Sequence, residues 1–405
     1  MERTLKPWPA LWSLVIGFFM ILIDTTIVSV ANPAIMRGLD ADINATLWAT
    51  SAYLLAYAVP LLITGRLGDR FGPRRIYLIG LVVFTLSSLF CGLAGTIDHL
   101  VIARVFQGLG AAMMTPQTMA VITRIFPPNQ RGTAMSLWGA TAGVATLVGP
   151  ILGGVIVDSL GWEWIFFINL PLGVIAFVCA LRFVPVLETR SHRFDVLGML
   201  LSALGMFLLV FGIQEGESFD WGTIVGPISV WSLIIAGIVV LGIFLWWQGA
   251  QKGEPLLPLG LFRDRNFSVA NLGIMTVGFV VTAMSLPLVF YFQTVRGMTP
   301  TQSALMLVPL AVLSGALAPV AGKLVDRSDP RFVATGGLGL MAVGLGAYAL
   351  LLRPETPLLL LLVPSAILGV ANAGIWGPLS SIATYNVPPA QAGAGSGVYN
   401  TTRQV

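Results

Sequence analysis

Residues 65–75 read GRLGDRFGPRR, a short charged and glycine-rich stretch that separates two long apolar runs. A weaker copy, GKLVDR, returns at residues 322–327 and again follows an apolar run directly. In both copies a glycine precedes an Asp-Arg pair with the same spacing, which gives Asp69-Arg70 in the first and Asp326-Arg327 in the second. Internal repeats of this kind are typical of membrane chains that consist of two related halves. The two copies therefore predict two halves.

The composition places both halves in a membrane. Of the 405 residues, 56% are hydrophobic and only 10% are charged, and the mean hydropathy is +0.87. Soluble domains carry about 25% charged residues. A spanning helix needs roughly 20 apolar residues, and little of this sequence lies outside runs of that length. We predict an all-α polytopic membrane protein without a sizeable soluble domain.

Twelve apolar runs are long enough to span a bilayer, and a thirteenth begins near residue 391. One hinge follows the second run and the other follows the tenth, so the second half begins at the ninth run. The seventh and eighth runs form an extra pair. We predict a first half at residues 1–185, two linker helices at 186–266 and a second half at 267–405. The runs lie near residues 10–33, 46–65, 76–95, 100–123, 132–157, 164–184, 196–213, 228–248, 267–292, 302–322, 332–352 and 357–386.

The distribution of positive charge predicts the orientation. If the N-terminus is cytoplasmic, the tail and the loops after spans two, four, six, eight and ten hold 17 of the 22 Lys and Arg residues, and the opposite side holds three. Cytoplasmic loops of membrane proteins carry this excess. The first run has no small-residue cleavage site after it, so we expect an uncleaved span. The sequence predicts a multi-pass protein of the plasma (inner) membrane with a cytoplasmic N-terminus.

The hinge resembles the signature of major facilitator transporters. Residues 22–28, LIDTTIV, and the pattern Leu100-x-x-x-Arg104-x-x-Gln107 resemble the first-helix and fourth-helix motifs of the fourteen-helix drug:proton antiporters. This resemblance implies the major facilitator fold, with two pseudo-symmetric six-helix halves and two inserted helices. It also implies six helices after residue 266, where the sequence has four and the start of a fifth. We therefore expect that the last one to two helices, roughly 50 or more residues, are missing.

Two ionisable residues, Asp24 and Arg104, lie well inside spans of the first half. Such groups cost about 2.5–3.5 kcal/mol on insertion scales, so each is a functional candidate. At 1.5 Å per residue, Asp24 lies about 9 Å and Arg104 about 6 Å below the outer surface. Tyr53 lies near 10 Å by the same arithmetic. We predict that the acid, the guanidinium and the phenol share a level and face one another.

These groups suit proton coupling. Burial favours the protonated form of a carboxyl group, and a nearby guanidinium favours the ionised form. We predict that Asp24 carries the proton and that Arg104 modulates the pKa of Asp24. By resemblance, Asp24, Tyr53, Gln107 and Asn169 are expected to bind substrate. Two alternatives stay open: Asp24 caps a helix break or pairs statically with Arg104, and Arg104 extends outward to the membrane surface.

The fifth run is rich in small residues, which allow close helix packing, and holds a proline, which kinks helices. The pattern resembles the antiporter motif found in exporters, although generic close packing explains it equally. The predicted gate residues are Gly143, Gly149, Pro150, Gly153 and Gly154.

The hinges are predicted to be conformational latches. Asp69 can accept hydrogen bonds from backbone N–H groups at a helix N-terminus. By resemblance its partner is the fifth helix of the second half, which begins at the glycine-rich stretch 393–397. The alternative is that the hinge only anchors topology. The predicted latch residues are Asp69, Arg70, Arg74, Asp326 and Arg327.

The predicted function is proton-driven export of lipophilic, cationic or amphipathic compounds by alternating access, hence multidrug efflux and antibiotic resistance. An exporter of lipid or of an endogenous metabolite or siderophore is the alternative, and a non-transporting sensor or scaffold is a distant one. Cys91 and Cys179 lie in apolar runs, and no nucleophile–base pair or phosphate-binding loop is evident, so we expect neither metal site nor enzyme. The expected partners are small lipophilic substrates, protons and membrane lipids, with no cofactor beyond the proton gradient and no nucleic acid. We expect a monomer.

Overall fold

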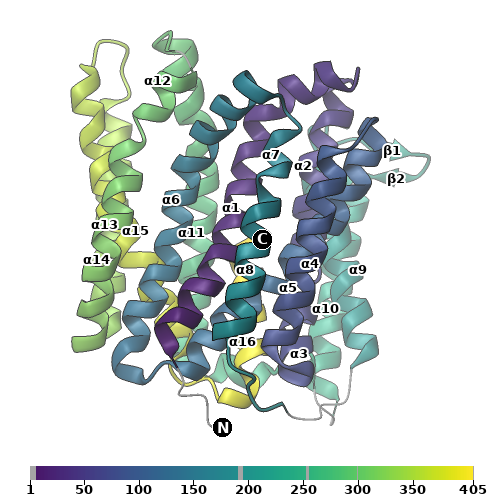
Figure 1. Ribbon diagram of the computed structural model, residues 1–405, viewed down its shortest axis with the longest axis vertical. Coiled ribbons are helices and arrows are strands. Elements are labelled where there is room, and N and C mark those ends of the chain that lie inside the picture. The colour runs from purple at the N-terminus through teal and green to yellow at the C-terminus, as the bar shows by residue number, and fades with distance from the viewer. Residues whose placement is uncertain (1–5, 190–194, 252–254, 299, 405) are drawn as a thin grey trace.

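The computed structural model describes residues 6–189, 195–251, 255–298 and 300–404. Four residues of the predicted charge bias lie outside this range: Arg3, Arg190, Arg193 and Lys252. The helices run up and down through one bundle, and the N-terminus lies at its lower end in Figure 1, called here the N-terminal end. The all-α polytopic architecture predicted from the sequence is confirmed.

The first eight helices come from the predicted first half. They are α1 (Pro7–Gly38), α2 (Ile43–Ala58), α3 (Leu61–Phe71), α4 (Pro73–Gly92), α5 (Ile97–Ile125), α6 (Pro128–Leu160), α7 (Trp164–Phe167) and α8 (Asn169–Phe183). The second predicted span is two helices, because α2 and α3 meet at 46°. The break falls at Pro60, which lacks a backbone N–H and cannot continue the hydrogen-bond ladder.

The predicted linker helices are α9 (Val196–Gln214) and α10 (Val230–Ala250). Between them a short antiparallel hairpin, β1 (Thr223–Val225) with β2 (Ile228–Ser229), stands at the opposite end of the bundle. The remaining elements are η1 (Leu259–Arg263), α11 (Arg265–Phe290), η2 (Tyr291–Val295), α12 (Pro300–Leu305), α13 (Val308–Arg327), α14 (Pro330–Leu351), α15 (Leu358–Thr384), η3 (Pro389–Gln391) and α16 (Ala392–Gln404).

The number of spans differs from the twelve predicted. Among the described residues ten helices are long and apolar enough to cross a membrane, or eleven when α2 and α3 count as one bent span. The remaining predicted run, at residues 100–123, forms α5, which lies between α2 and α4 in the bundle. Polar residues on its buried face, such as Arg104, Gln107 and Gln117, make α5 less apolar than the other spans. The predicted division at residues 185 and 266 stays a prediction.

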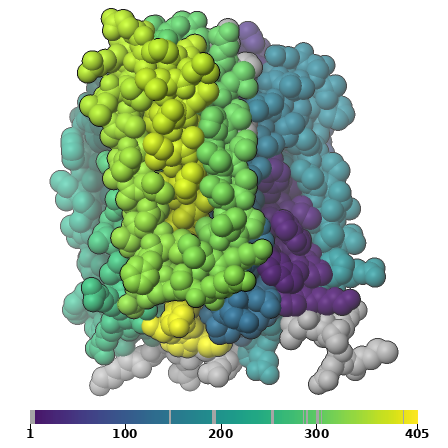
Figure 2. Space-filling view, turned by 90° about the vertical axis from the view of Figure 1, so that its left-hand side faces the viewer, coloured from purple at the N-terminus to yellow at the C-terminus, as the bar shows by residue number. Residues whose placement is uncertain are grey.

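One hydrophobic core joins the beginning of the chain to its end. Phe18 of α1 stacks on Trp138 of α6, with ring centroids 4.9 Å apart. The same cluster contains Ile375 of α15 and Tyr399 of α16. Figure 2 shows the later helices, green to yellow, as a continuous face with the purple N-terminal segment beside it. Residues from opposite ends of the sequence thus share one core.

The carboxylate of Asp195 caps α9 and links it to α10 at the N-terminal end of the bundle. Asp195 precedes α9 and accepts a hydrogen bond from the backbone N–H of Gly198 at 2.8 Å. It also accepts from Trp247 Nε1 at 2.9 Å, Gln248 Nε2 at 2.7 Å and Gln251 Nε2 at 2.8 Å. Burial acts to raise the pKa of Asp195, but these hydrogen bonds outweigh it and the pKa is lowered. The ionised carboxylate is therefore the form that joins α9 to α10.

We expect Asp195→Ala to destabilise the protein by about 2 kcal/mol, because a helix cap and three further hydrogen bonds are lost. Since the folded pKa is lowered, the contribution of Asp195 is present above its unfolded pKa of about 3.9 and is lost as pH falls below it. Thermal unfolding in detergent at neutral and acid pH measures both effects. A variant as stable as the native chain at neutral pH contradicts this role. Asp158→Ala, near the end of α6, serves as the control.

Candidate functional site

The central feature of the first half is a group of polar side chains buried inside it. Arg104 Nη1 on α5 donates to Asp24 Oδ2 on α1 at 2.5 Å. The same nitrogen donates to Gln107 Oε1 at 2.8 Å, and Gln107 Nε2 donates to Asp24 Oδ1 at 2.8 Å. All three side chains have 0% of their surface exposed. An ion pair enclosed in this way costs desolvation free energy that its geometry must offset.

Three further helices close the site. Asn169 Nδ2 at the start of α8 donates to Asp24 Oδ1 and to Ser88 Oγ on α4, each at 3.0 Å. The Tyr53 ring of α2 lies under the guanidinium, with Arg104 Cζ 4.0 Å from its centroid. Arg104 Nε donates to the carbonyl oxygen of Ala49 at 3.1 Å. We call Asp24, Arg104, Gln107, Asn169 and Ser88, with the Tyr53 ring, the buried polar cluster.

The depth arithmetic placed Asp24, Arg104 and Tyr53 at one level, and the structure brings them into contact. It also brings Gln107 and Asn169 to the same carboxylate. All of these predicted substrate-binding side chains are buried and turned toward one another, so in this conformation they are closed to a ligand. Their roles toward substrate and proton stay predictions.

The contribution of α4 to the site was not predicted from the sequence. Ser88 accepts from Asn169, and the thiol of Cys91 donates to Gln107 Oε1 at 3.5 Å. Ser88 and Cys91 are three positions apart on one face of a helix. Two polar residues at this spacing in an otherwise apolar run could have indicated that α4 contributes to the site.

The carboxylate of Asp24 has its hydrogen-bond partners inside the buried polar cluster. Asp24 accepts from three donors, so it has the partners of an ionised carboxylate. Arg104 Nη2 is buried without a hydrogen-bond partner among the described residues. An unpaired buried donor costs about 1–3 kcal/mol, which lowers the free energy needed to separate the pair.

The first hinge contacts α16, the helix that was predicted as its partner. Asp69, in α3, accepts from the backbone N–H of Gly393 at 2.8 Å and of Ala394 at 2.9 Å. These are the first N–H groups of α16, where a helix leaves its donors unpaired and favours negative charge. A Cβ atom on Gly65 would collide with the carbonyl oxygen of Gly393. Only glycine allows the two helices to approach this closely, and we call this contact the first latch.

The second hinge makes the reciprocal contact. Asp326 of α13 accepts from the N–H of Gly132 at 2.7 Å and of Thr133 at 3.0 Å, near the start of α6. A Cβ atom on Gly322 would collide with the backbone of Thr133. Asp69 thus lies at the first turn of α16, and Asp326 lies beside the second turn of α6. This second latch, whose partner residues the sequence reasoning did not identify, closes the N-terminal end together with the first.

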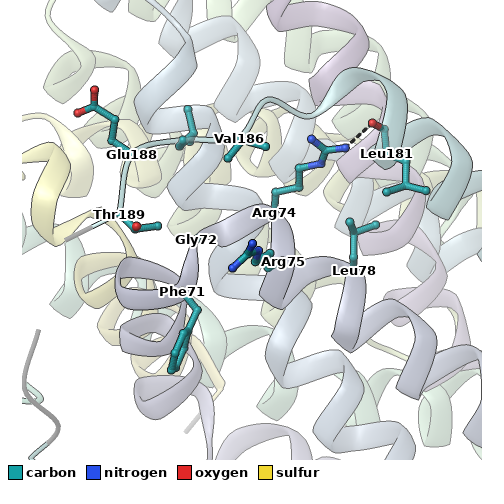
Figure 3. Close-up of a pocket in the computed structure, with 10 residues that line it drawn as sticks. Phe71, Gly72, Arg74, Arg75, Leu78, Leu181, Val186, Glu188 and Thr189 are labelled. Carbon is teal, nitrogen blue, oxygen red and sulfur yellow. Dashed lines mark hydrogen bonds between the residues drawn. The ribbon is translucent and has the colours of Figure 1, made fainter. Parts of the chain in front are cut away.

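The predicted basic latch residues lie elsewhere. Arg74 Nη2 donates to the carbonyl oxygen of Leu181 at 2.5 Å, near the end of α8 and within the first half (Figure 3). The Arg70 guanidinium lies 5.4 Å from the ring centroid of Phe71. Arg327 is exposed at the end of α13. The carboxylates carry the contact between the halves, whereas Arg74 braces the first hinge.

The predicted gate residues divide between two neighbours of α6. Cβ atoms on Gly149 and Gly153 would collide with Thr26 and Ile27 of α1, two and three residues after Asp24. A Cβ on Gly143 would contact Ser314 of α13, whereas Gly154 has open space. α6 therefore packs tightly against the helix of the candidate proton site and also against the second half. Pro150 lies inside α6, which continues through it as one helix.

A cavity of about 170 Å³ lies between α6 and the second half. Its walls are mostly apolar, with contributions from α11, α13, α14 and α15. Lining residues include Gly143, Pro150, Met284, Met341, Asn372 and Trp376. The cavity is distinct from the buried polar cluster, because none of its lining residues belongs to that cluster.

Comparisons with known proteins identify similar sequences and similar structures. The family model described as Major Facilitator Superfamily matches residues 14–405. An uncharacterized transporter of this type from Mycobacterium tuberculosis is 49% identical over 99% of this chain and 68% of its own. The tetracenomycin C resistance and export protein of Streptomyces glaucescens is 33% identical over 99% of this chain and 74% of its own. The structure of the human organic anion transporter MFSD10 superposes with a TM-score of 0.69, over 98% of this chain and 91% of its own. At 15% sequence identity this similarity shows only that the two proteins share a fold.

Proposed function

The chain belongs to the Major Facilitator Superfamily of membrane transporters, and from that premise we propose that it is a proton-coupled exporter of lipophilic, amphipathic compounds. The family match covers nearly the whole chain, and the predicted major facilitator fold is confirmed. Export of antibiotic-like compounds is supported by a relative named for resistance and export. We place the chain in the fourteen-helix drug:proton antiporter branch, since α9 and α10 stand between the two hinges.

The observation that carries the proposal is the enclosed contact between Asp24 and Arg104. A carboxylate and a guanidinium inside a membrane bundle are costly to keep. A transporter uses them when one conformation pairs them and another separates them, because the acid then takes up and releases a proton. We assign Asp24 to the proton alone, since its three hydrogen bonds occupy it fully here.

The latches supply the other part of the cycle. We propose that the N-terminal end of the bundle is cytoplasmic, in agreement with the charge distribution. Both latches are formed, so the structure then represents the state that is closed toward the cytoplasm. Opening them lets the halves rock about the cavity between α6 and the second half, as alternating access requires.

Transport into vesicles tests this proposal. The purified protein is reconstituted, the lumen is made acidic, and uptake of one cationic and one anionic lipophilic dye is followed by fluorescence. We expect uptake of dye into vesicles whose protein is oriented with its N-terminal end outside, with loss of uptake after a protonophore. If labelled lipid or small metabolites move while neither dye does, export of a lipid or metabolite replaces drug export as the function. Uptake that ignores the protonophore contradicts proton coupling.

A further inference from the structure

One charge deep in the bundle belongs to neither the polar cluster nor a latch. The guanidinium of Arg403, on α16, lies among three aromatic rings from three other helices. Its Cζ is 5.6 Å from the ring centroid of Phe18, 5.7 Å from Trp138 and 5.9 Å from Trp376. No role for Arg403 was predicted from the sequence. Its position at the edge of the last apolar run concealed how deep it lies.

Arg403 lies at the membrane depth that is expected of a substrate site. At 1.5 Å per residue from the first latch at Gly393, Arg403 lies about 15 Å into the bundle, close to the middle of a 30 Å hydrocarbon layer. The rings come from α1, α6 and α15, so the charge lies where the first half meets the second. Substrate sites of secondary transporters lie near the midplane at this junction.

The same face of α15 also borders the cavity. Trp376, which contacts Arg403, lines the cavity, and so does Asn372 one helical turn away. The carbonyl oxygen of the Asn372 side chain is buried without a hydrogen-bond partner among the described residues. An amide at this place can pair with a polar group of a ligand. The cavity thus has apolar walls, an unpaired amide carbonyl oxygen and, beyond Trp376, a cation.

The charges around this site have one sign. Asp24, the acid within the first-half spans, is enclosed and neutralised by Arg104. Asp69 and Asp326 are held at the latches. Within the described chain no salt bridge is found at Arg403, whose side chain is only partly buried, and its contacts there are with rings. Rings hold a guanidinium by cation–π attraction but leave its N–H donors for an anion.

We propose that the substrates of this transporter are amphipathic organic anions, whose apolar body fills the cavity and whose acidic group pairs with Arg403. This inference rests on the proposed function and specifies its substrate class, in place of the cationic compounds expected from the sequence. The guanidinium donates to the carboxylate, sulfonate or phenolate of the ligand. The rings of Trp138 and Trp376 flank the ligand's apolar part.

Two lipophilic ions of similar size and opposite charge test the proposal. A naphthalenesulfonate, whose oxygens can accept hydrogen bonds from a guanidinium, and a trimethylnaphthylammonium are titrated separately into the purified protein, and binding is followed by equilibrium dialysis. We expect the native protein to bind the anion about tenfold or more tightly than the cation, as one charge-assisted contact allows. Arg403→Gln should remove this preference, whereas Arg353→Gln, exposed at the opposite end, should keep it. Equal or cation-favouring affinities in the native protein overturn the proposal, as does a preference that survives Arg403→Gln.

Two further readouts separate this proposal from the proposed function. Thermal unfolding checks that Arg403→Gln is folded, and Arg403→Lys, which keeps the charge, should retain the preference. If proton-driven uptake of dye occurs but binding shows no anion preference, only the substrate class is wrong. If the preference depends on Arg403 while no compound moves under a pH gradient, the site stands and the proton-coupled export falls.

Discussion

Asp24→Asn should abolish transport driven by a pH gradient. Asparagine has nearly the same shape and can still accept from Gln107 and Asn169, but it cannot take up or release a proton. The variant also leaves the Arg104 guanidinium buried without its counter-charge, which costs about 3–5 kcal/mol. Uptake of the dye by reconstituted vesicles with an acidic lumen measures the first effect. Thermal unfolding measures the second.

A double variant separates lost coupling from lost stability. In Asp24→Asn/Arg104→Gln both buried charges are absent, so most of the stability should return while coupling stays lost. Asp98→Asn, which is exposed in the first turn of α5, is the matched control and should transport like the native protein. Gradient-driven uptake in the folded double variant would show that the pair is a static structural contact, which was one alternative open at the level of sequence.

Gly65→Val should trap the protein with its N-terminal end open. The new side chain would collide with the backbone of Gly393, so the first latch cannot form as it does here. Overpacking of this kind costs about 1–3 kcal/mol, which shifts the equilibrium between closed and open states by about 5–150-fold. Distances between spin labels at the N-terminal ends of α4 and α14 should lengthen, and transport should fall in proportion.

The control for the latch is a glycine with free space around it. A Cβ atom on Gly336 in α14 would have no atom within 4 Å, so Gly336→Val should leave transport unchanged. Asp69→Asn should weaken the latch without a clash and give a smaller change of the same sign. If Gly65→Val closes and transports like the native protein, the contact with α16 is not needed for the cycle.

The spacing of residues in the sequence was sufficient to predict the fold and much of the buried polar cluster. Runs of apolar residues gave the helices, and counting at 1.5 Å per residue placed Asp24, Arg104 and Tyr53 at one level. The repeated hinge indicated that Asp69 would contact α16, which it does. These successes rely on distances along helix axes, which a bilayer fixes.

The direction in which a side chain points around its helix axis could not be predicted by counting residues. Counting along α1 does not tell whether Asp24 faces the central cavity or the interior of its own half, and the structure shows the latter. Partners such as Ser88 for Asn169, or Gly132 for Asp326, depend on packing between helices distant in sequence. Arg403 was overlooked for the same reason, because three helices far apart in the chain supply its rings.

If Asp24 exchanges a proton for substrate, the entry of substrate must move protons in the opposite direction. Vesicles with equal pH on both sides enclose a pH-sensitive dye, and a transported compound is added to the outside. We expect that the lumen becomes more alkaline as the compound enters through native protein, and that its pH stays constant with the Asp24→Asn/Arg104→Gln variant. Substrate entry through the native protein without any change in lumen pH, or an equal change with the variant, would contradict this expectation.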